Sequence, residues 1–365
     1  MKRVALRAAT STATFLLALE IALRIYNPLP FRVRGDHIVL PVHQSYTISH
    51  PGAVRMDRVT HVVKNSLGFR GPEPPRDWSK RFTVLTIGGS TTECRFLSDG
   101  NTWTDQLTRR VTAVRPDVWI NNAGFEGHST FGHLVLLREF VISMRPKMAI
   151  FLTGYNDMKL ASARTIDNEL NPQNLSIGHR VLTFLADHSE VGAVGENFIR
   201  MRRTYEAGVR TTEVRLDELV PRPLDDEKMN AILKQHRSGF LAGYAQRLAD
   251  LVETSRRNGI EPVLMTQPAL YGDVVDPSSG VALDTAAIGL SNGRVEWHSL
   301  ELYNDVTRRL SQEAGVRLVD LAHEMPKDSR YFTDWVHYTN DGAKLVGDIV
   351  FRHLEPWIQS NRGER

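Results

Sequence analysis

The sequence predicts an α/β protein with a three-layer, doubly wound parallel sheet of about five strands. Two patterns support this fold class. Short apolar runs rich in β-branched residues alternate with longer segments whose apolar residues have helical spacing. Such alternation is typical of parallel strands joined by right-handed helical crossovers. Polar residues and glycines directly follow several of the runs, at the position where open α/β sheets bind their ligands.

The alternation begins at residue 82 and continues almost to the C-terminus. A short apolar run bounded by glycine or proline is typical of a buried strand, and a longer periodic segment is typical of a helix. We therefore expect strands at 82–87, 118–121, 148–152, 262–265 and 316–321. We expect helices at about 103–114, 130–144, 229–257, 297–314 and 341–358.

The first residues predict a signal anchor. Lys2, Arg3 and Arg7 precede an apolar stretch at 8–19, a pattern similar to that of a secretory signal. No small-residue cleavage site follows it, and residues 4–25 taken as one helix are barely long enough to cross a bilayer. We expect a transmembrane helix that leaves the body of the protein membrane-anchored and extracytoplasmic, or periplasmic in a Gram-negative bacterium. A cleaved signal and an amphipathic surface helix are the alternatives.

Changes in pattern divide the chain into three parts. Residues 1–30 form the anchor and a proline-containing link, 31–80 an N-terminal extension, and 81–360 the α/β domain. Within that domain, the polar stretch at 158–228 interrupts the alternation of strands and helices. A connection of this length usually has a function, so we expect a partly helical insert or lid over the strand ends. A flexible spacer is the alternative.

Composition and motifs argue against several functional classes. The net charge is only +3, and Lys and Arg are spread along the chain, so we expect no nucleic-acid partner. Cys94 is the single cysteine, which excludes an intrachain disulfide and a cysteine-based zinc site. Neither the nucleotide-binding glycine motifs nor His-Glu-x-x-His occurs. We expect no metal and no organic cofactor.

Ser90 is the first candidate functional residue. The apolar run at 82–87 stops at Gly88 and Gly89, and Ser90 follows at once. The two glycines allow a tight turn and a close approach of other backbone, which places Ser90 just past the carboxyl end of a strand. There a serine acts as a nucleophile or as the N-cap of the next helix. This stretch alone leaves both interpretations open.

Three later strand ends supply complementary groups. Since the carboxyl ends of parallel strands share one rim, polar residues that follow different strands converge there. A carboxylate three residues before an imidazole can accept its Nδ1 proton, leaving Nε2 free to take a proton from a serine hydroxyl. Backbone and amide N–H groups at the same rim can stabilise developing negative charge as an oxyanion hole. The residues in question are Gly127 and His128 after the second strand, Asn156 after the third, and Asp334 and His337 after the fifth.

These blocks resemble the SGNH hydrolase family, also called GDSL-type esterases and lipases. Gly88–Thr91, the segment ending at Gly127, Gly154–Asp157 and Asp334–His337 correspond to its first, second, third and fifth blocks. The resemblance implies a flavodoxin-like SGNH fold. It implies Ser90 as nucleophile, His337 as general base and acid, Asp334 as its orienter, and Ser90, Gly127 and Asn156 as the oxyanion hole.

The resemblance spans about residues 82–355, and residues 65–73 with the N-terminal segment resemble membrane-associated bacterial members. Gly89 stands where the family's name has Asp, and the insert at 158–228 matches no part of the pattern. His128 is a candidate substrate contact, with a surface role as the alternative.

The sequence therefore predicts a serine esterase that forms an acyl-enzyme on Ser90 and uses no cofactor. An envelope location suggests O-acyl or O-acetyl groups on glycans, or small esters, as substrates. One alternative is an O-acyltransferase that uses the same Ser-His-Asp site. The other is a non-enzymatic envelope binding protein that keeps the fold.

Overall fold

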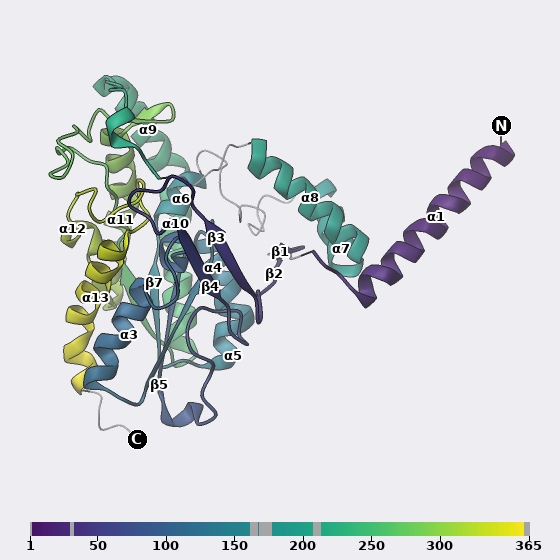
Figure 1. The fold of residues 1–365 in the computed structure, drawn as a ribbon, viewed down its shortest axis with the longest axis horizontal. Coiled ribbons are helices and arrows are strands. Elements are labelled where there is room, and N and C mark those ends of the chain that lie inside the picture. Colours follow the sequence, from purple (N-terminus) through teal and green to yellow (C-terminus); the bar gives the residue numbers. More distant parts are fainter. Residues whose placement is uncertain (1, 30–32, 161–166, 168–176, 207–212, 361–365) are drawn as a thin grey trace. The chain divides into compact units, whose positions relative to one another are not determined.

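The computed structural model describes residues 2–29, 33–160, 167, 177–206 and 213–360 (Figure 1). The chain forms two compact units, each drawn from separate parts of the sequence. The first consists of Met1–Pro41 and Asn168–Val209, and the second of Val42–Asp167 and Arg210–Arg365. The second unit contains the predicted α/β domain apart from residues 168–209 of its insert, which belong to the first unit.

The second unit is built on a five-stranded parallel sheet, as predicted. Its order is β11-β8-β7-β5-β6, which is the flavodoxin-like order with its reversal between β5 and β7. Every residue of β5 and β7 is buried, as expected for strands covered on both faces. The strands are β5 (Phe82–Gly88), β6 (Val118–Gly124), β7 (Met148–Leu152), β8 (Glu261–Met265) and β11 (Arg317–Val319).

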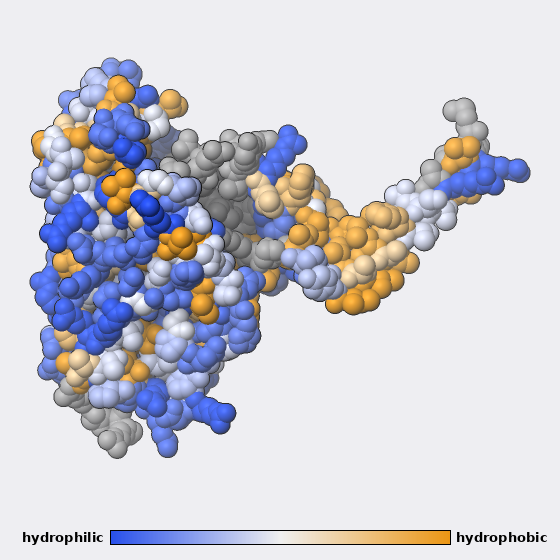
Figure 2. Space-filling view, in the orientation of Figure 1, coloured by the Kyte–Doolittle hydropathy of each residue, from blue (hydrophilic) through white to orange (hydrophobic). Residues whose placement is uncertain are grey.

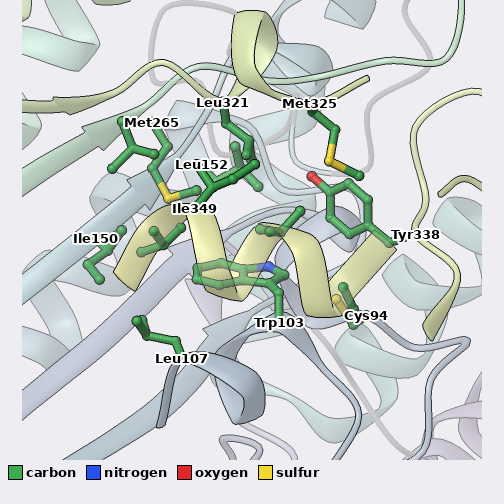
Figure 3. Packing of buried hydrophobic residues seen from close by; sticks show 14 of the residues in the cluster. Cys94, Trp103, Leu107, Ile150, Leu152, Met265, Leu321, Met325, Tyr338 and Ile349 are labelled. Carbon is green, nitrogen blue, oxygen red and sulfur yellow. The ribbon is translucent and has the colours of Figure 1, made fainter. Parts of the chain in front are cut away.

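Helices cover both faces of this sheet. On one face α3 (Trp103–Val114) and α13 (Asn340–Ser360) pack together and share a core with β5, β7 and β8. On the other face α10 (Leu241–Arg257) packs between α4 (Thr130–Leu136) and α11 (Gly293–Ala314). Figure 3 shows the first core, which includes Trp103 and Leu107 of α3, Ile349 of α13, and Ile150 and Leu152 of β7.

Short elements complete the second unit. The hairpin of β3 (Ser45–Ser49) and β4 (Val59–Val63) precedes the sheet, and residues after it run along the edge strand β6. There Arg70 and Asn122 exchange backbone hydrogen bonds of 2.9 Å in both directions, which covers an otherwise open sheet edge. The others are η1 (Trp78–Lys80), α2 (Ser90–Glu93), α6 (Tyr155–Lys159), η6 (Leu216–Glu218), β9 (Ala287–Ile288), β10 (Ser291–Asn292) and α12 (Leu321–Glu324).

Several predicted boundaries were wrong. The helix predicted at 229–257 is two helices, α9 (Asp226–Gly239) and α10, separated by Phe240 with φ −128° and ψ −34°. The segment at 130–144 passes from α4 through a π-helical turn, η2 (Leu137–Val141), into α5 (Ile142–Met144). The strand predicted at 316–321 is only β11, because α12 begins at Leu321. Apolar periodicity does not mark these breaks, since α4 and η2, like α9 and α10, bury apolar residues on both sides of the break.

The first unit joins the N-terminus to part of the predicted insert. Its elements are α1 (Lys2–Ile25), β1 (Val33–Arg34), β2 (His37–Ile38), α7 (Ile177–His188) and α8 (Glu190–Glu206). The Glu20 carboxylate accepts hydrogen bonds from the N–H groups of Glu190 and Val191, so α1 supplies a side-chain cap for α8. Residues 161–166, 168–176 and 207–212 of the predicted insert lie outside the described residues.

The prediction of a transmembrane helix is not supported. A helix forms at α1, with 24 residues, but no helix in the described part of the chain is long and apolar enough to cross a membrane. Arg7 and Glu20 border a charge-free stretch, Ala8–Leu19, that is shorter than the roughly 20 apolar residues a crossing needs.

We predict that Leu107→Ala lowers the stability of the second unit by about 2–5 kcal/mol. Leu107 is 0% exposed, so the substitution leaves a cavity between α3 and α13. Leu290→Ala, at a leucine that is 91% exposed, is the matched control and should change stability by less than about 0.5 kcal/mol. Urea denaturation followed by tryptophan fluorescence measures both, and equal effects would contradict this description of the core.

Candidate active site

The turn after β5 places Ser90 at the start of α2. Gly89 is the N-cap and Ser90 the first helical residue, so the interpretation of Ser90 as an N-cap was wrong. The two glycines are required by close packing. A Cβ on Gly88 would lie 2.9 Å from the Leu152 carbonyl oxygen, and one on Gly89 would lie 2.3 Å from Asn156 Nδ2. A side chain at Gly88 would push β7 away from this turn, and one at Gly89 would displace the Asn156 amide.

Ser90, His337 and Asp334 form a continuous hydrogen-bonded chain. His337 Nε2 lies 2.8 Å from Ser90 Oγ, and His337 Nδ1 lies 2.7 Å from Asp334 Oδ2. The other Asp334 oxygen accepts the backbone N–H groups of Val336 and His337, at 2.9 and 2.8 Å. With Nδ1 protonated toward Asp334, Nε2 is an acceptor for the Ser90 hydroxyl proton. The three residues predicted to act together thus meet in one place.

Burial and charge oppose each other in this chain. Burial by itself would lower the pKa of His337, but the charge and hydrogen bond of Asp334 outweigh it and leave that pKa above its ordinary value. Burial would likewise raise the pKa of Asp334, yet its bonds to His337 and to backbone N–H groups leave it below the ordinary value. The arrangement therefore favours a carboxylate beside an imidazole of increased basicity.

Two of the three predicted oxyanion donors, Ser90 and Asn156, line one small pocket. Ser90 is the first residue of α2, so its N–H has no acceptor inside that helix. Asn156 lines the same pocket as Ser90, and its Nδ2 donates to the His128 carbonyl oxygen at 2.7 Å. Gly127 is not among the lining residues; it lies in the adjoining turn with φ +79°, a conformation that suits glycine.

His128 lies at the pocket rather than on the surface. It is buried, lines the pocket and packs its ring against Phe125 with centroids 5.4 Å apart. The surface role considered for it was therefore wrong. The pocket has an empty volume of about 240 Å³ and is lined by Gly89, Ser90, Thr91, His128, His133, Leu152, Thr153, Gly154, Tyr155, Asn156, Asp157 and Gln267.

Asp157 connects the turns that carry Asn156 and Gly127. It is buried and accepts from Thr130 Oγ1 at 2.5 Å and from the Thr130 N–H at 3.2 Å. Arg247 of α10 approaches the same carboxylate at 3.1 Å. Sequence reasoning missed Arg247, because it lies in the middle of a helix with no motif around it.

Asp167 is another buried carboxyl group, and unlike Asp157 it lies in none of the motifs identified from the sequence. It accepts from the N–H groups of Ser129 and Gly132, at 2.5 and 2.9 Å. Burial nevertheless raises its pKa to about 7. His133, which also lines the pocket, is buried and has its pKa lowered to about 4 by burial, so it is neutral near pH 7.

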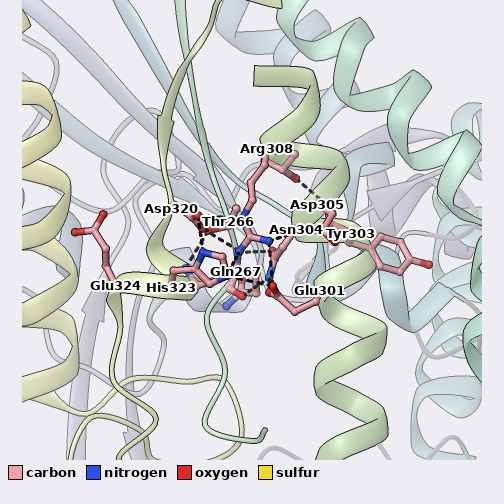
Figure 4. A network of polar contacts seen from close by, with 12 residues as sticks. Thr266, Gln267, Glu301, Tyr303, Asn304, Asp305, Arg308, Asp320, His323 and Glu324 are labelled. Carbon is pink, nitrogen blue, oxygen red and sulfur yellow. Dashed lines mark hydrogen bonds and ion pairs between the residues drawn. The ribbon is translucent and has the colours of Figure 1, made fainter. Parts of the chain in front are cut away.

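A polar network holds the pocket residue Gln267 from the side of α11 (Figure 4). The Gln267 N–H donates to Asn304 Oδ1 at 2.9 Å, and Asn304 Nδ2 donates back to the Gln267 carbonyl oxygen at 3.1 Å. Gln267 Oε1 then accepts from Thr91 Oγ1 at 3.0 Å. The residue next to Ser90 is thereby tied to α11. Arg308 extends the network through ion pairs with Glu301 and Asp320.

One group among the described residues brings together three potential metal ligands. Asp36, His37 and Asp187 of the first unit place their ligand atoms within 4.8 Å of one another. Asp36 and His37 are exposed, and such acidic groups occur often on protein surfaces without a metal. This geometry does not by itself make a metal site.

Comparisons with known proteins agree with the predicted family. The model of the GDSL-like Lipase/Acylhydrolase family matches residues 86–345. No curated protein matches the sequence significantly.

Three solved structures are among those that match this chain. A catalytic mutant of Axe2, an acetylxylan esterase from Geobacillus stearothermophilus, is 15% identical, covers 74% of this chain and 93% of its own, and gives a TM-score of 0.42. LAE5, an α/β hydrolase enzyme from the metagenome of Lake Arreo, Spain, is 14% identical, with 75% and 94% covered and a TM-score of 0.43. The lipase/acylhydrolase from Enterococcus faecalis is 14% identical, with 75% and 96% covered and a TM-score of 0.42.

The family match spans well over half of the chain and includes every block from the Ser90 turn to His337. The protein belongs to the GDSL-like lipase/acylhydrolase family and is a hydrolase that acts on ester bonds.

Proposed function

We propose that the protein is a serine esterase that removes short O-acyl groups, such as acetyl, from glycans or small alcohols. The observation that carries the proposal is the chain from Asp334 through His337 to Ser90, with contacts of 2.7 and 2.8 Å. Each atom in it already has the partner that nucleophilic catalysis by serine requires.

The proposed reaction has two halves. In the first, Ser90 Oγ attacks the ester carbonyl carbon and passes its proton to His337 Nε2. His337 gives that proton to the departing alcohol oxygen as the carbon–oxygen bond breaks, which leaves an acyl-enzyme. In the second half, water attacks the acyl carbon and gives its proton to His337. The carboxylic acid leaves as Ser90 Oγ regains that proton.

The oxyanion formed in each half needs donors near Ser90. We assign this role to the N–H groups of Ser90 and Gly127 and to Asn156 Nδ2. Asn156 lines the pocket with Ser90, which supports its assignment, and Asp157 ties its turn to the one after Gly127. His128 is assigned as a contact to the acyl group, since it lines the same pocket.

The lining of the pocket favours a short acyl group. Nearly all of the lining residues are polar or glycine, and such a surface does not suit a long hydrocarbon chain. The mechanism proposed here uses no metal and no organic cofactor.

We also propose that the first unit lies on a membrane surface and that the hydrolase unit works outside the cytoplasm. Apolar side chains gather over α1 and α7 (Figure 2), including Phe15, Leu17 and Phe184, which are 64%, 62% and 59% exposed. Arg3 and Arg7 are exposed at the start of α1. An exposed apolar face flanked by basic residues fits an interfacial helix on anionic lipid.

We predict that Ser90→Ala and His337→Ala each lower turnover of p-nitrophenyl acetate by about 10³-fold or more, because the residues act as a unit. Ser143→Ala, at an exposed serine of α5, is the control and should hydrolyse the ester like the parent. Hydrolysis by Ser90→Ala at the rate of the parent would contradict the mechanism.

Addition of glycerol to the same assay tests for acyl transfer. Formation of acylated glycerol without extra free acid would indicate an O-acyltransferase.

We predict that kcat/KM falls as the pH is lowered, with a midpoint above pH 6.5. Only neutral His337 can take the Ser90 proton, and protonation removes that form below its pKa, which Asp334 holds above the ordinary value of 6.5. A pH profile of ester hydrolysis measures the midpoint. An acid limb centred at or below pH 6.5 would contradict the proposed role of Asp334.

We predict that the full chain sediments with vesicles containing phosphatidylglycerol. Replacing both Phe15 and Leu17 by Asp should abolish sedimentation, because the exposed apolar face of α1 is then charged. Leu290→Asp, at the exposed leucine of the other unit, should bind like the parent. A parent chain that stays in the supernatant, or a double variant that still sediments, would rule out this surface.

A further inference from the structure

The N-terminal extension supplies two buried cations to the neighbourhood of Ser90. Lys64 and Arg70 are 1% and 2% exposed, and both precede the region that the family model matches, residues 86–345. A buried cation is costly unless it is paired or hydrogen-bonded. The partners of these two residues therefore indicate which part of the site the extension holds in place.

Lys64 is paired with a carboxylate on the helix that begins at Ser90. Its Nζ lies 3.0 Å from Glu93 Oε1, and Glu93 is itself 4% exposed at the side chain. Glu93 is the last residue of α2. The pair thus joins the extension to the far end of the short helix that carries Ser90.

The same carboxylate reaches the turn that contains Gly127. Glu93 Oε2 accepts the backbone N–H of Glu126 at 2.7 Å, and Glu126 directly precedes Gly127. Lys64 Nζ also lies 5.1 Å from the centre of the Phe125 ring, one residue earlier, a favourable cation–π distance. Lys64 therefore contacts this turn at Phe125, and Glu93 binds it at the next residue, Glu126.

Arg70 secures the C-terminal end of α2. Its Nη1 donates to the carbonyl oxygens of Glu93 and Cys94, at 2.8 and 2.7 Å. Terminal carbonyl groups of a helix have no partner inside it, so Arg70 satisfies them. Asp99 accepts from Arg70 Nη2 at 2.6 Å. Arg70 thus holds the C-terminal end of α2 through its backbone, whereas Lys64 contacts α2 through the Glu93 side chain.

We propose that Lys64 is a positioning residue for the oxyanion hole. By compensating the charge of Glu93, it keeps the Glu93 carboxylate between α2 and the Glu126 N–H, and so fixes Gly127 relative to Ser90. A buried ion pair contributes little net stability compared with apolar residues of similar size. The proposed effect of Lys64 is therefore on the position of Gly127, and the rate of the reaction measures it. The inference rests on the proposed acyl-enzyme function.

Three variants of the full chain separate this role from simple stability. Lys64→Met removes the ammonium group that pairs with the Glu93 carboxylate. Glu93→Gln keeps an acceptor for the Glu126 N–H but sets an amide NH₂ against the Lys64 ammonium group. The double variant removes both charges and keeps the acceptor. Arg110→Met, which breaks the exposed ion pair with Asp348 between α3 and α13, is the control.

The expected result is a loss in kcat with KM unchanged. A fluorophosphonate probe first counts active sites, so that misfolded protein does not enter the rate of p-nitrophenyl acetate hydrolysis. Each single variant should lose about tenfold or more in kcat per site, since complete removal of an oxyanion donor costs about 10²–10³-fold. The double variant should recover to within about threefold of the parent, because the Gln amide still accepts the Glu126 N–H. Arg110→Met should match the parent.

Two outcomes would overturn the inference. One is a kcat per active site for Lys64→Met within twofold of the parent. The other is a double variant as slow as the slower single variant. Both are distinct from failure of the proposed function, which would appear as an active Ser90→Ala enzyme whatever the Lys64 variants do.

Discussion

Buried carboxylates that accept backbone N–H groups fix the loops around Ser90. A carboxylate taken out of water is tolerated only when its oxygens are hydrogen-bonded, so each one holds its donors in place. The bonds of Glu93, Asp157 and Asp167 join segments that are far apart in sequence, whereas those of Asp334 shape the local turn that carries His337. The carboxylates are Glu93 with Glu126, Asp157 with Thr130, Asp167 with Ser129 and Gly132, and Asp334 with Val336 and His337.

Glycines, which have no side chain, are as important as these bonds for the close packing around Ser90. Gly88 and Gly89 let β7 and Asn156 approach the turn before Ser90, and Gly124 does the same on the other side. A Cβ on Gly124 would lie 2.3 Å from the Glu93 nitrogen, so α2 rests directly on the end of β6. The short helix α2 thus packs against the ends of β6 and β7, and Arg70 of the N-terminal extension binds its C-terminal carbonyl groups.

The fold and the positions of the principal candidate site residues were predictable from sequence, and many of the residues that contact them were not. All five strands and the rim positions of Ser90, Asn156 and His337 follow from apolar runs and the residues after them. Arg247 and Asp167 carry no local signal, because an arginine inside a helix and an aspartate in an insert look like ordinary surface residues. The predicted transmembrane helix was not supported, because the apolar stretch between Arg7 and Glu20 is too short to cross a bilayer. The break at Phe240 was missed since both flanking helices keep their apolar spacing.

The sequence by itself determined the parallel sheet, the order of its strands along the chain and the kinds of polar side chain that follow their ends. Periodicity reports these features because backbone hydrogen bonding and burial impose them locally. Only the tertiary structure decided which buried charges meet. Lys64 and Glu93 are apart in sequence and belong to different segments, yet their 3.0 Å contact follows from the extension lying along β6. Such a pairing depends on the packing of whole segments against one another, and no local pattern encodes it.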